Sequence, residues 1–118
     1  MKMNRTTLTY LFFLLIFTVG AFAKDPVDVN VIEVGLDHVT VNLCANVALN
    51  TRVQLKVLLE PVPVVIALKT LQLHLAAHVC LKVKIFAILQ VGKLYEVECD
   101  EDKSGNRLGS SKEFSPSS

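Results

Sequence analysis

The fold is decided by residues 39–59, VTVNLCANVALNTRVQLKVLL, and by residues 71–91, LQLHLAAHVCLKVKIFAILQV. In both stretches almost every odd-numbered residue is apolar, and most charged and amide side chains fall on even numbers. Successive side chains of a β-strand point to opposite faces, so a period of two buries one face and exposes the other. The alternation therefore predicts an all-β fold.

Residues 1–23 have the pattern of a secretory signal peptide. Lys2 and Arg5 give a positive start, an apolar stretch runs from Leu11 to Val19, and Ala21-Phe22-Ala23 fits a small-residue cleavage site. The apolar stretch is shorter than the roughly 20 residues that span a membrane, so cleavage is favoured over an uncleaved signal anchor. We therefore expect a secreted, extracellular protein without a membrane span in its mature form.

The charge of the mature chain excludes some classes of partner. Cleavage after Ala23 removes two of the twelve basic residues and leaves ten Lys and Arg against eleven Asp and Glu, a formal charge of −1. Nucleic-acid-binding domains and membrane-active peptides usually carry a basic excess. We therefore expect no nucleic-acid partner, and a membrane-active defence peptide is disfavoured.

The mature chain divides into a β domain, residues 24–99, and a tail, residues 100–118. The tail is acidic at its start and rich in Ser, and only Leu108 and Phe114 are large apolar residues. Such a composition buries too little apolar surface to offset the entropy of ordering, so the tail is predicted to be disordered. A domain of about 75 residues is marginal on its core alone and usually needs covalent or oligomeric help.

Turn-forming residues divide the domain into about six antiparallel strands. The predicted interruptions are Gly35-Leu36-Asp37, Asn50-Thr51-Arg52, Glu60-Pro61-Val62-Pro63 and Gln90-Val91-Gly92. The first separates a strand over Val27 to Val34 from a strand over His38 to Leu49. The second and the fourth are predicted to be three-residue hairpin loops, which set Leu49 opposite Val53 and Leu89 opposite Lys93. The prolines of the third remove ladder donors.

The stretch from Val64 to Leu89 contains no Gly, Pro, Asn or Asp and is longer than a usual strand of three to ten residues. Either a bend near Ala76-Ala77-His78 carries the chain between two sheets, or the strands are long and curved. A helix is the competing interpretation, but apolar residues would surround it and β-branched residues are abundant. The predicted architecture is a small antiparallel β-sandwich or an open, partly closed barrel.

Three cysteines remain after cleavage. In an extended chain Cys44 and Cys80 share the even, outward face, whereas Cys99 lies on the odd, inward face. Small secreted domains usually form disulfides, so we predict a Cys44–Cys80 bridge. A Cys80–Cys99 bridge is the second choice and requires the last hairpin to shift. Cys99 is then either a buried thiol or an intermolecular bridge, and the sequence leaves both open.

No complete catalytic or metal-binding constellation can be assembled from the sequence. His74 and His78 share a strand face, but four residues at about 3.3 Å each place them about 13 Å apart, too far for one zinc ion. Asp100 to Asn106 resembles the first half of an EF-hand loop, but Ser111 stands where the bidentate glutamate belongs. Because phosphate-binding and G-x-S-x-G motifs are also missing, we predict no enzyme activity, no metal and no cofactor.

The alternation fails where even-numbered residues become apolar too. These exceptions would project from the outward face, and strands at interfaces have this pattern. The predicted apolar binding patch consists of Ile32, Val34, Leu36, Leu58, Val62, Val64, Ile66, Phe86 and Ile88.

We therefore expect a small secreted non-enzymatic binding protein that uses this apolar patch, or an apolar interior, to hold a lipid-like ligand or a protein partner. A homodimer is one form of such association. The alternative is a disulfide-linked structural protein that assembles outside the cell. The identity of the ligand or partner does not follow from the sequence.

Overall fold

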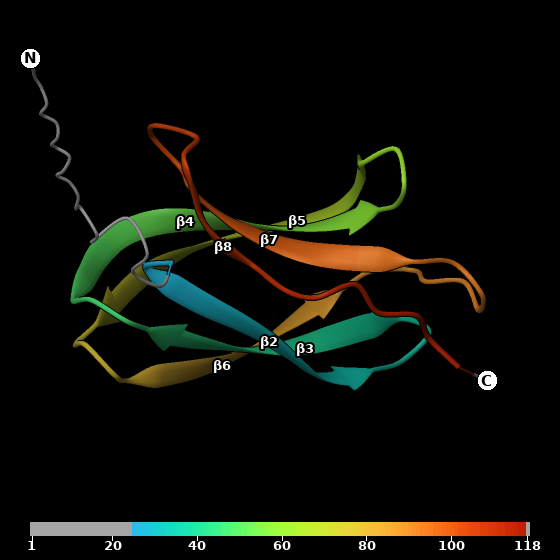
Figure 1. Ribbon diagram of the computed structural model, residues 1–118, viewed down its shortest axis with the longest axis horizontal. Coiled ribbons are helices and arrows are strands. Elements are labelled where there is room, and N and C mark those ends of the chain that lie inside the picture. Colours follow the sequence, from blue (N-terminus) through green and yellow to red (C-terminus); the bar gives the residue numbers. More distant parts are fainter. Residues whose placement is uncertain (1–24, 118) are drawn as a thin grey trace, which may run out of the picture.

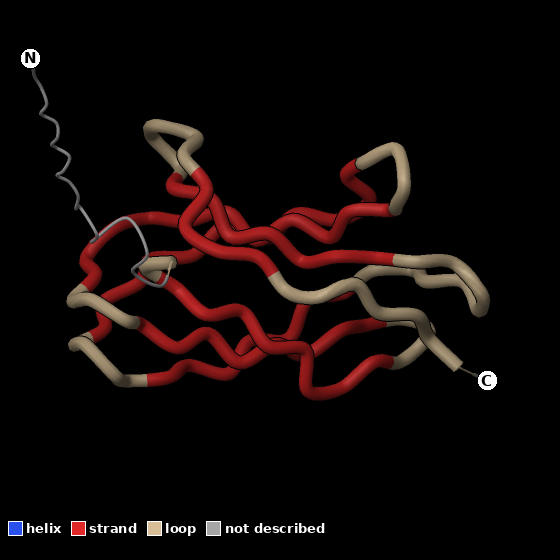
Figure 2. Tube along the Cα trace, in the orientation of Figure 1, coloured by secondary structure: helices blue, strands red, loops and turns tan. Residues whose placement is uncertain are grey.

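A computed structural model describes residues 25–117 and contains seven strands in two antiparallel sheets (Figure 1). The strands are β2 (Val27–Val34), β3 (His38–Ala45), β4 (Leu49–Leu59), β5 (Val64–Leu75), β6 (Cys80–Phe86), β7 (Tyr95–Glu101) and β8 (Arg107–Ser110). Between residues 25 and 117 the chain forms strands and loops without a helix (Figure 2). The prediction of an all-β chain is therefore confirmed, with seven strands where about six were expected.

The predicted signal peptide, residues 1–23, lies outside the described residues. Within the described part of the chain, no helix is long and apolar enough to cross a membrane.

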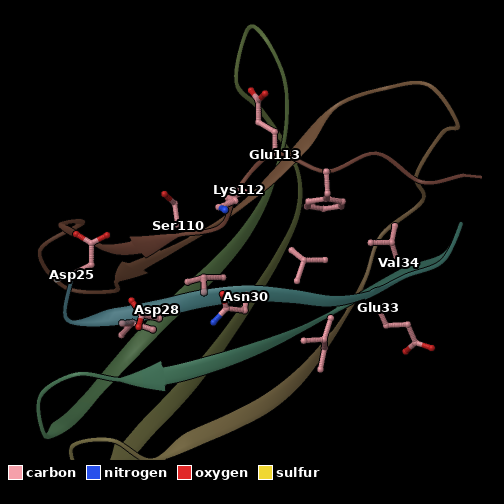
Figure 3. A pocket seen from close by; sticks show the side chains of 13 residues that line it. Asp25, Asp28, Asn30, Glu33, Val34, Ser110, Lys112 and Glu113 are labelled. Atoms are coloured by element: carbon pink, nitrogen blue, oxygen red, sulfur yellow. The ribbon is translucent and has the colours of Figure 1, made fainter.

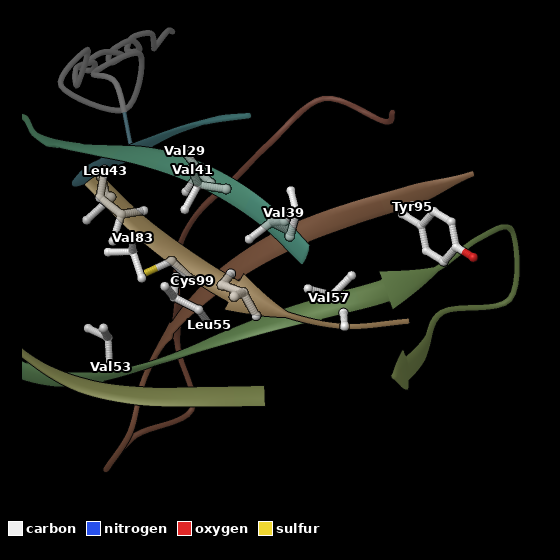
Figure 4. Close-up of a cluster of buried hydrophobic side chains, with 14 of the residues drawn as sticks. Val29, Val39, Val41, Leu43, Val53, Leu55, Val57, Val83, Tyr95 and Cys99 are labelled. Atoms are coloured by element: carbon white, nitrogen blue, oxygen red, sulfur yellow. The ribbon is translucent and has the colours of Figure 1, made fainter. Parts of the chain in front are cut away.

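The two sheets face one another and enclose the core. One sheet has the strand order β2-β3-β6, and the other has the order β5-β4-β7-β8. The core side chains come from both sheets, as Figure 4 shows for Val41 and Leu43 of β3 and for Val53 and Leu55 of β4. Among the buried apolar residues only Leu58 has an even number. The alternation therefore predicted the core-facing side correctly for most strand residues, with Leu58 as an exception.

Both predicted hairpins were wrong. β3 and β4 belong to different sheets, and the supposed loop Asn50-Thr51-Arg52 lies inside β4. β6 and β7 are likewise in different sheets, so Leu89 does not pair with Lys93. β3 pairs with β6, and β4 pairs with β5 and β7. The period of two indicates which face of a strand is buried, but an apolar face is buried equally well by a neighbour or by the opposite sheet.

The interruption at residues 60–63 is where the sequence places it, and of the two alternatives for residues 64–89 the bend is the one that the structure shows. Glu60-Pro61-Val62-Pro63 forms the turn between β4 and β5. The bend near Ala76-Ala77-His78 carries the chain from β5, in the four-stranded sheet, to β6, in the three-stranded sheet. His78 adopts a positive φ of 70° in this bend. The long apolar stretch is therefore two strands, and the helical interpretation is wrong.

The prediction of a disordered tail was wrong for residues 100–117. β7 extends to Glu101, and β8 pairs with β7. Beyond β8, the backbone N–H of Phe114 donates to the Tyr95 carbonyl at 2.9 Å, and the Tyr95 N–H donates to the Phe114 carbonyl at 2.8 Å. Leu108 and Phe114 pack against the core. The composition of the tail is poor in apolar residues, but its backbone pairs with β7, and composition does not reveal pairing.

The predicted disulfide is present. Cys44 in β3 lies directly opposite Cys80 in β6, and the two are bonded across a sequence separation of 36 residues. The bond joins the two strands at the end of the three-stranded sheet where β6 begins. Cys99 is a free cysteine and is fully buried.

Replacing both bonded cysteines, in C44A/C80A, should lower the free energy of unfolding by about 3–4 kcal/mol, because the unfolded chain regains the entropy of a long loop. Urea denaturation followed by circular dichroism measures this difference. Wild-type protein in a reducing agent is the matched control and should unfold at the same urea concentration as the variant. A loss below about 1 kcal/mol would show that the bridge adds little to the sheet pairing.

Candidate functional site

The predicted patch residues are distributed over three regions. Val62 lies in the turn before β5, and Val64 and Ile66 lie at the start of β5. Leu36, Phe86 and Ile88 lie where the β2–β3 turn meets the end of β6. Ile32 and Val34 lie in β2. Leu58 is 7% exposed and therefore belongs to the buried set.

Two of the failures in the alternation are β-bulges. In β2, Val31 pairs with Val41 and Glu33 pairs with Thr40, so Ile32 is an extra residue. In β5, Ala67 pairs with Val57 and Val65 pairs with Leu58, so Ile66 is an extra residue. A bulge shifts the parity of the strand beyond it.

Val34 shows the effect of this shift. It pairs with the buried Val39 and packs against the core, although its even number predicted an outward side chain. The prediction that Val34 projects from the outward face was therefore wrong.

The largest group of exposed apolar side chains is at the start of β5, and we call it the β5 surface. β5 is an edge strand of its sheet. The members of the β5 surface are exposed by 38–73% and are Val62, Val64, Val65, Ile66 and Leu68. Val65 and Leu68 were missed, but the uninterrupted apolar run from Val62 to Leu68 is a signal for them.

A smaller group is formed by Leu36, Phe86 and Ile88, which are 51–79% exposed. The backbone N–H of Leu89 donates to the Leu36 carbonyl at 2.8 Å, so the chain after β6 runs beside the β2–β3 turn. The Nζ of Lys84 lies 5.8 Å from the centre of the Phe86 ring. This cluster therefore carries a cation at its border.

A groove runs along the free side of β2, between this strand and the segment after β8 (Figure 3). It has a volume of about 590 Å³ and is lined by Asp25 and residues 27–34 on one side and by Ser110, Lys112, Glu113 and Phe114 on the other. Ile32 and Val34, which were predicted as patch residues, line this groove. Carboxylates of Asp25, Asp28, Glu33 and Glu113 surround it, with Lys112 as the basic residue among the lining side chains.

The three cysteines are unsuited to nucleophilic or intermolecular chemistry. Cys44 and Cys80 are bonded to each other. The Cys99 side chain is 0% exposed. Burial, with a smaller contribution from the neighbouring Asp100 carboxylate, raises the pKa of the Cys99 thiol to about 12. Because the thiolate is the reactive form, Cys99 is an inert core residue.

None of the three histidines belongs to a metal-binding cluster among the described residues. His74 lies in β5, His78 lies in the following bend, and Cys80 is in the disulfide. In residues 25–117, no group of three His, Cys, Asp or Glu side chains is close enough to hold a metal ion. His38 Nδ1 is 2.8 Å from an Asp37 carboxylate oxygen, and this hydrogen bond lowers the pKa of Asp37.

The segment that resembles half of an EF-hand has a structural role. Asp100 is buried in β7, and one of its carboxylate oxygens lies 2.8 Å from the Lys56 Nζ. Glu101 accepts hydrogen bonds from the hydroxyls of Ser104 and Thr51, which lower the pKa of its carboxyl. These contacts hold the start of the β7–β8 connection against β4.

No protein-family model matches the sequence, and a search of curated proteins finds no significant match.

Cys99 should resist iodoacetamide at pH 8 in the folded protein, because its thiol is buried and its pKa lies far above this pH. Unfolding in urea without a reductant should expose one reactive thiol per chain, which intact-mass spectrometry detects. Non-reducing electrophoresis should show only monomer. Rapid labelling of the folded protein, or a dimer that reductant dissolves, would contradict the placement of Cys99 in the core.

The free energy of unfolding should rise as the pH falls from 7 towards 5. Burial raises the pKa of Glu98, and the neighbouring Asp100 raises it further. The folded state therefore binds this proton more tightly than the unfolded chain does, and folding becomes more favourable as Glu98 is protonated. Urea denaturation at several pH values should show a smaller rise in E98Q than in wild type. The exposed E113Q is the control, and an equal rise in E98Q and wild type would contradict the assignment.

Proposed function

We propose that the mature protein is a small secreted, non-enzymatic binding protein with a β-sandwich architecture, and that it binds a protein partner through the β5 surface. The observation that supports this proposal most is the exposure of Val64, Val65, Ile66 and Leu68 on an edge strand, with Val62 exposed in the turn before it. A long apolar edge strand favours aggregation unless something covers it. A partner strand that pairs with β5 would bury these side chains and bond to the free backbone groups of β5.

Packing of the core favours a protein partner over a lipid-like ligand. A lipid site between the sheets would need an open interior, whereas the side chains there are packed, with Val57, Leu73 and Val97 each 0% exposed. The described hollows lie along β2 and beside the ends of β4 and β5 at residues 48–52 and 72–76. The β5 surface is instead a strand edge, which suits another strand better than an acyl chain.

The secreted location is supported by two independent features. The sequence of residues 1–23 has the charge, length and cleavage pattern of a signal peptide. The Cys44–Cys80 disulfide is the kind of bond that persists in oxidising compartments.

The alternative, a structural protein that assembles through disulfides, has less support. Two of the three cysteines are bonded within the chain, and the third is buried in the core. Association between copies would therefore be non-covalent, which makes it a form of the binding proposed here.

Binding of the neutral dye Nile red tests the β5 surface. The wild-type protein should show a saturable rise in dye fluorescence, and V65T/L68T should reduce it several-fold, because two exposed apolar side chains are replaced by polar ones that still suit a strand. V91T changes an exposed valine elsewhere and is the matched control. Thermal unfolding of all three proteins shows whether the variants remain folded.

Two results would overturn the proposal. One is the lack of a saturable dye site in the folded wild-type protein. The other is co-sedimentation with phosphatidylcholine vesicles that V65T/L68T abolishes, which would assign the β5 surface to lipid. Dye binding that depends on Val65 and Leu68, without vesicle binding, supports a protein partner.

A further inference from the structure

We infer that the groove along β2 is a second binding site, and that it takes an extended peptide of alternating basic and apolar residues as an added strand on β2. This site is separate from the β5 surface, because β2 belongs to the three-stranded sheet and β5 to the four-stranded sheet. The inference therefore stands or falls independently of the function proposed above.

The backbone of β2 is open on the groove side beyond Val27, where Gly109 of β8 covers it. In residues 25–117, β2 is paired along one side only, with β3. A Cβ atom added to Gly109 of β8 would overlap the carbonyl oxygen of Val27, so this carbonyl points away from β3. In an antiparallel strand, alternate residues direct both backbone groups to the same side. The N–H and C=O of Val29 therefore also face the groove, where an added strand would bond to them.

The groove exists because its two walls belong to different sheets. At Gly109 and Val27 the walls are in contact. Beyond this point, the chain after β8 remains bonded to β7, with the Ser111 N–H donating to the Val97 carbonyl at 2.8 Å. β2 instead remains paired with β3. The two walls enclose the groove shown in Figure 3, with a volume of about 590 Å³.

Apolar and polar side chains alternate along the part of β2 that lines the groove. Val29 and Val31 are inward-facing residues of β2, and with Phe114 they give the groove an apolar side. Asp28 lies on the outward face, where its partner in β3 is Cys44, and Glu33 is paired with Thr40 on the same face. A peptide strand also alternates its side chains between two faces. An added strand would therefore place apolar residues towards Phe114 and its other residues beside Asp28 and Glu33.

Charge complementarity selects a basic peptide for this groove. Four carboxylates line it against one lysine, and the side chain of Glu33 is 63% exposed. Opposite charges on neighbouring strands attract, whereas like charges repel. Lysine or arginine side chains on the outward face of an added strand would therefore meet Asp28 and approach Glu33, whose Oε1 also accepts a hydrogen bond from the Thr40 hydroxyl at 3.2 Å and lies 3.5 Å from His38 Nε2. An acidic peptide would be rejected.

A second copy of the chain is a less suitable occupant. Residues 81–86, LKVKIF, have the alternating basic and apolar pattern, but in the folded protein they lie in β6 and pair with β3. The Nζ of Lys69 in β5 donates to the carbonyl of Lys84 at 3.0 Å. This contact satisfies a backbone group of β6 and leaves it less available for a neighbouring molecule. The partner that fits is a segment of another protein.

A fluorescently labelled, end-blocked peptide of three Lys-Val repeats tests the inference by fluorescence anisotropy. The wild-type protein should bind it saturably, and binding should weaken as salt is added. D28N/E33Q should weaken binding at least tenfold, because it removes two of the four carboxylates that line the groove with little change in shape. D102N/E96Q is the matched control, since it removes the same charge outside the groove, and it should change the affinity less than twofold.

Two control peptides separate strand addition from simple charge attraction. A Glu-Val peptide of the same length should not bind. A Lys-Val peptide with N-methylated valines keeps its charge but loses backbone donors, and it should bind at least tenfold more weakly. V65T/L68T, which alters the β5 surface, should bind the Lys-Val peptide as wild type does.

Several results would overturn the inference: no saturable binding of the Lys-Val peptide, equal binding of the N-methylated peptide, or equal binding by D28N/E33Q. Sedimentation equilibrium without peptide provides a further test. A dimer that both D28N/E33Q and K82Q/K84Q dissociate would assign the groove to a second copy of the chain. A monomer that binds the Lys-Val peptide with the stated dependence on Asp28 and Glu33 supports the inference.

Discussion

The structure depends on the mutual burial of two sheets, each of which has one apolar face. Val39, Val41 and Leu43 of β3 and Val53, Leu55 and Val57 of β4 are all 0% exposed. Each fully buried side chain of this size stabilises the folded state by about 1.5–3 kcal/mol. One sheet by itself could not keep these residues from water. The disulfide adds a covalent link within one sheet, but the contact between the sheets makes the fold.

This arrangement also determines where binding surfaces can form. Two sheets of three and four strands have edges, and edges present unpaired backbone groups. At one edge, β5 carries exposed apolar side chains. At another edge, β2 is separated from the chain after β8 by an acidic groove. The two surfaces have different chemistry, so they suit different occupants.

Several features of the fold and the site were predictable because they depend on local patterns. The alternation identified the buried face, and the shared face of Cys44 and Cys80 identified the disulfide. The failures of the alternation at Ile32 and Ile66 marked irregular positions, which the structure shows to be β-bulges at the groove and at the β5 surface. The sequence did not show that these positions belong to separate surfaces, because that depends on which strands are neighbours.

The sequence by itself determined the class of fold, the inward face of most strand residues and the shared face of Cys44 and Cys80, since each follows from a period of two. It left a bend after β5 as one of two alternatives. Only the tertiary structure decided the pairing of β3 with β6 and of β4 with β7, and the ordering of residues 100–117. Val57 is buried whether its neighbour lies beside it or across the core, so hydrophobicity does not choose between these pairings. Phe114 is ordered by backbone bonds to Tyr95, and backbone groups are the same in every residue except proline.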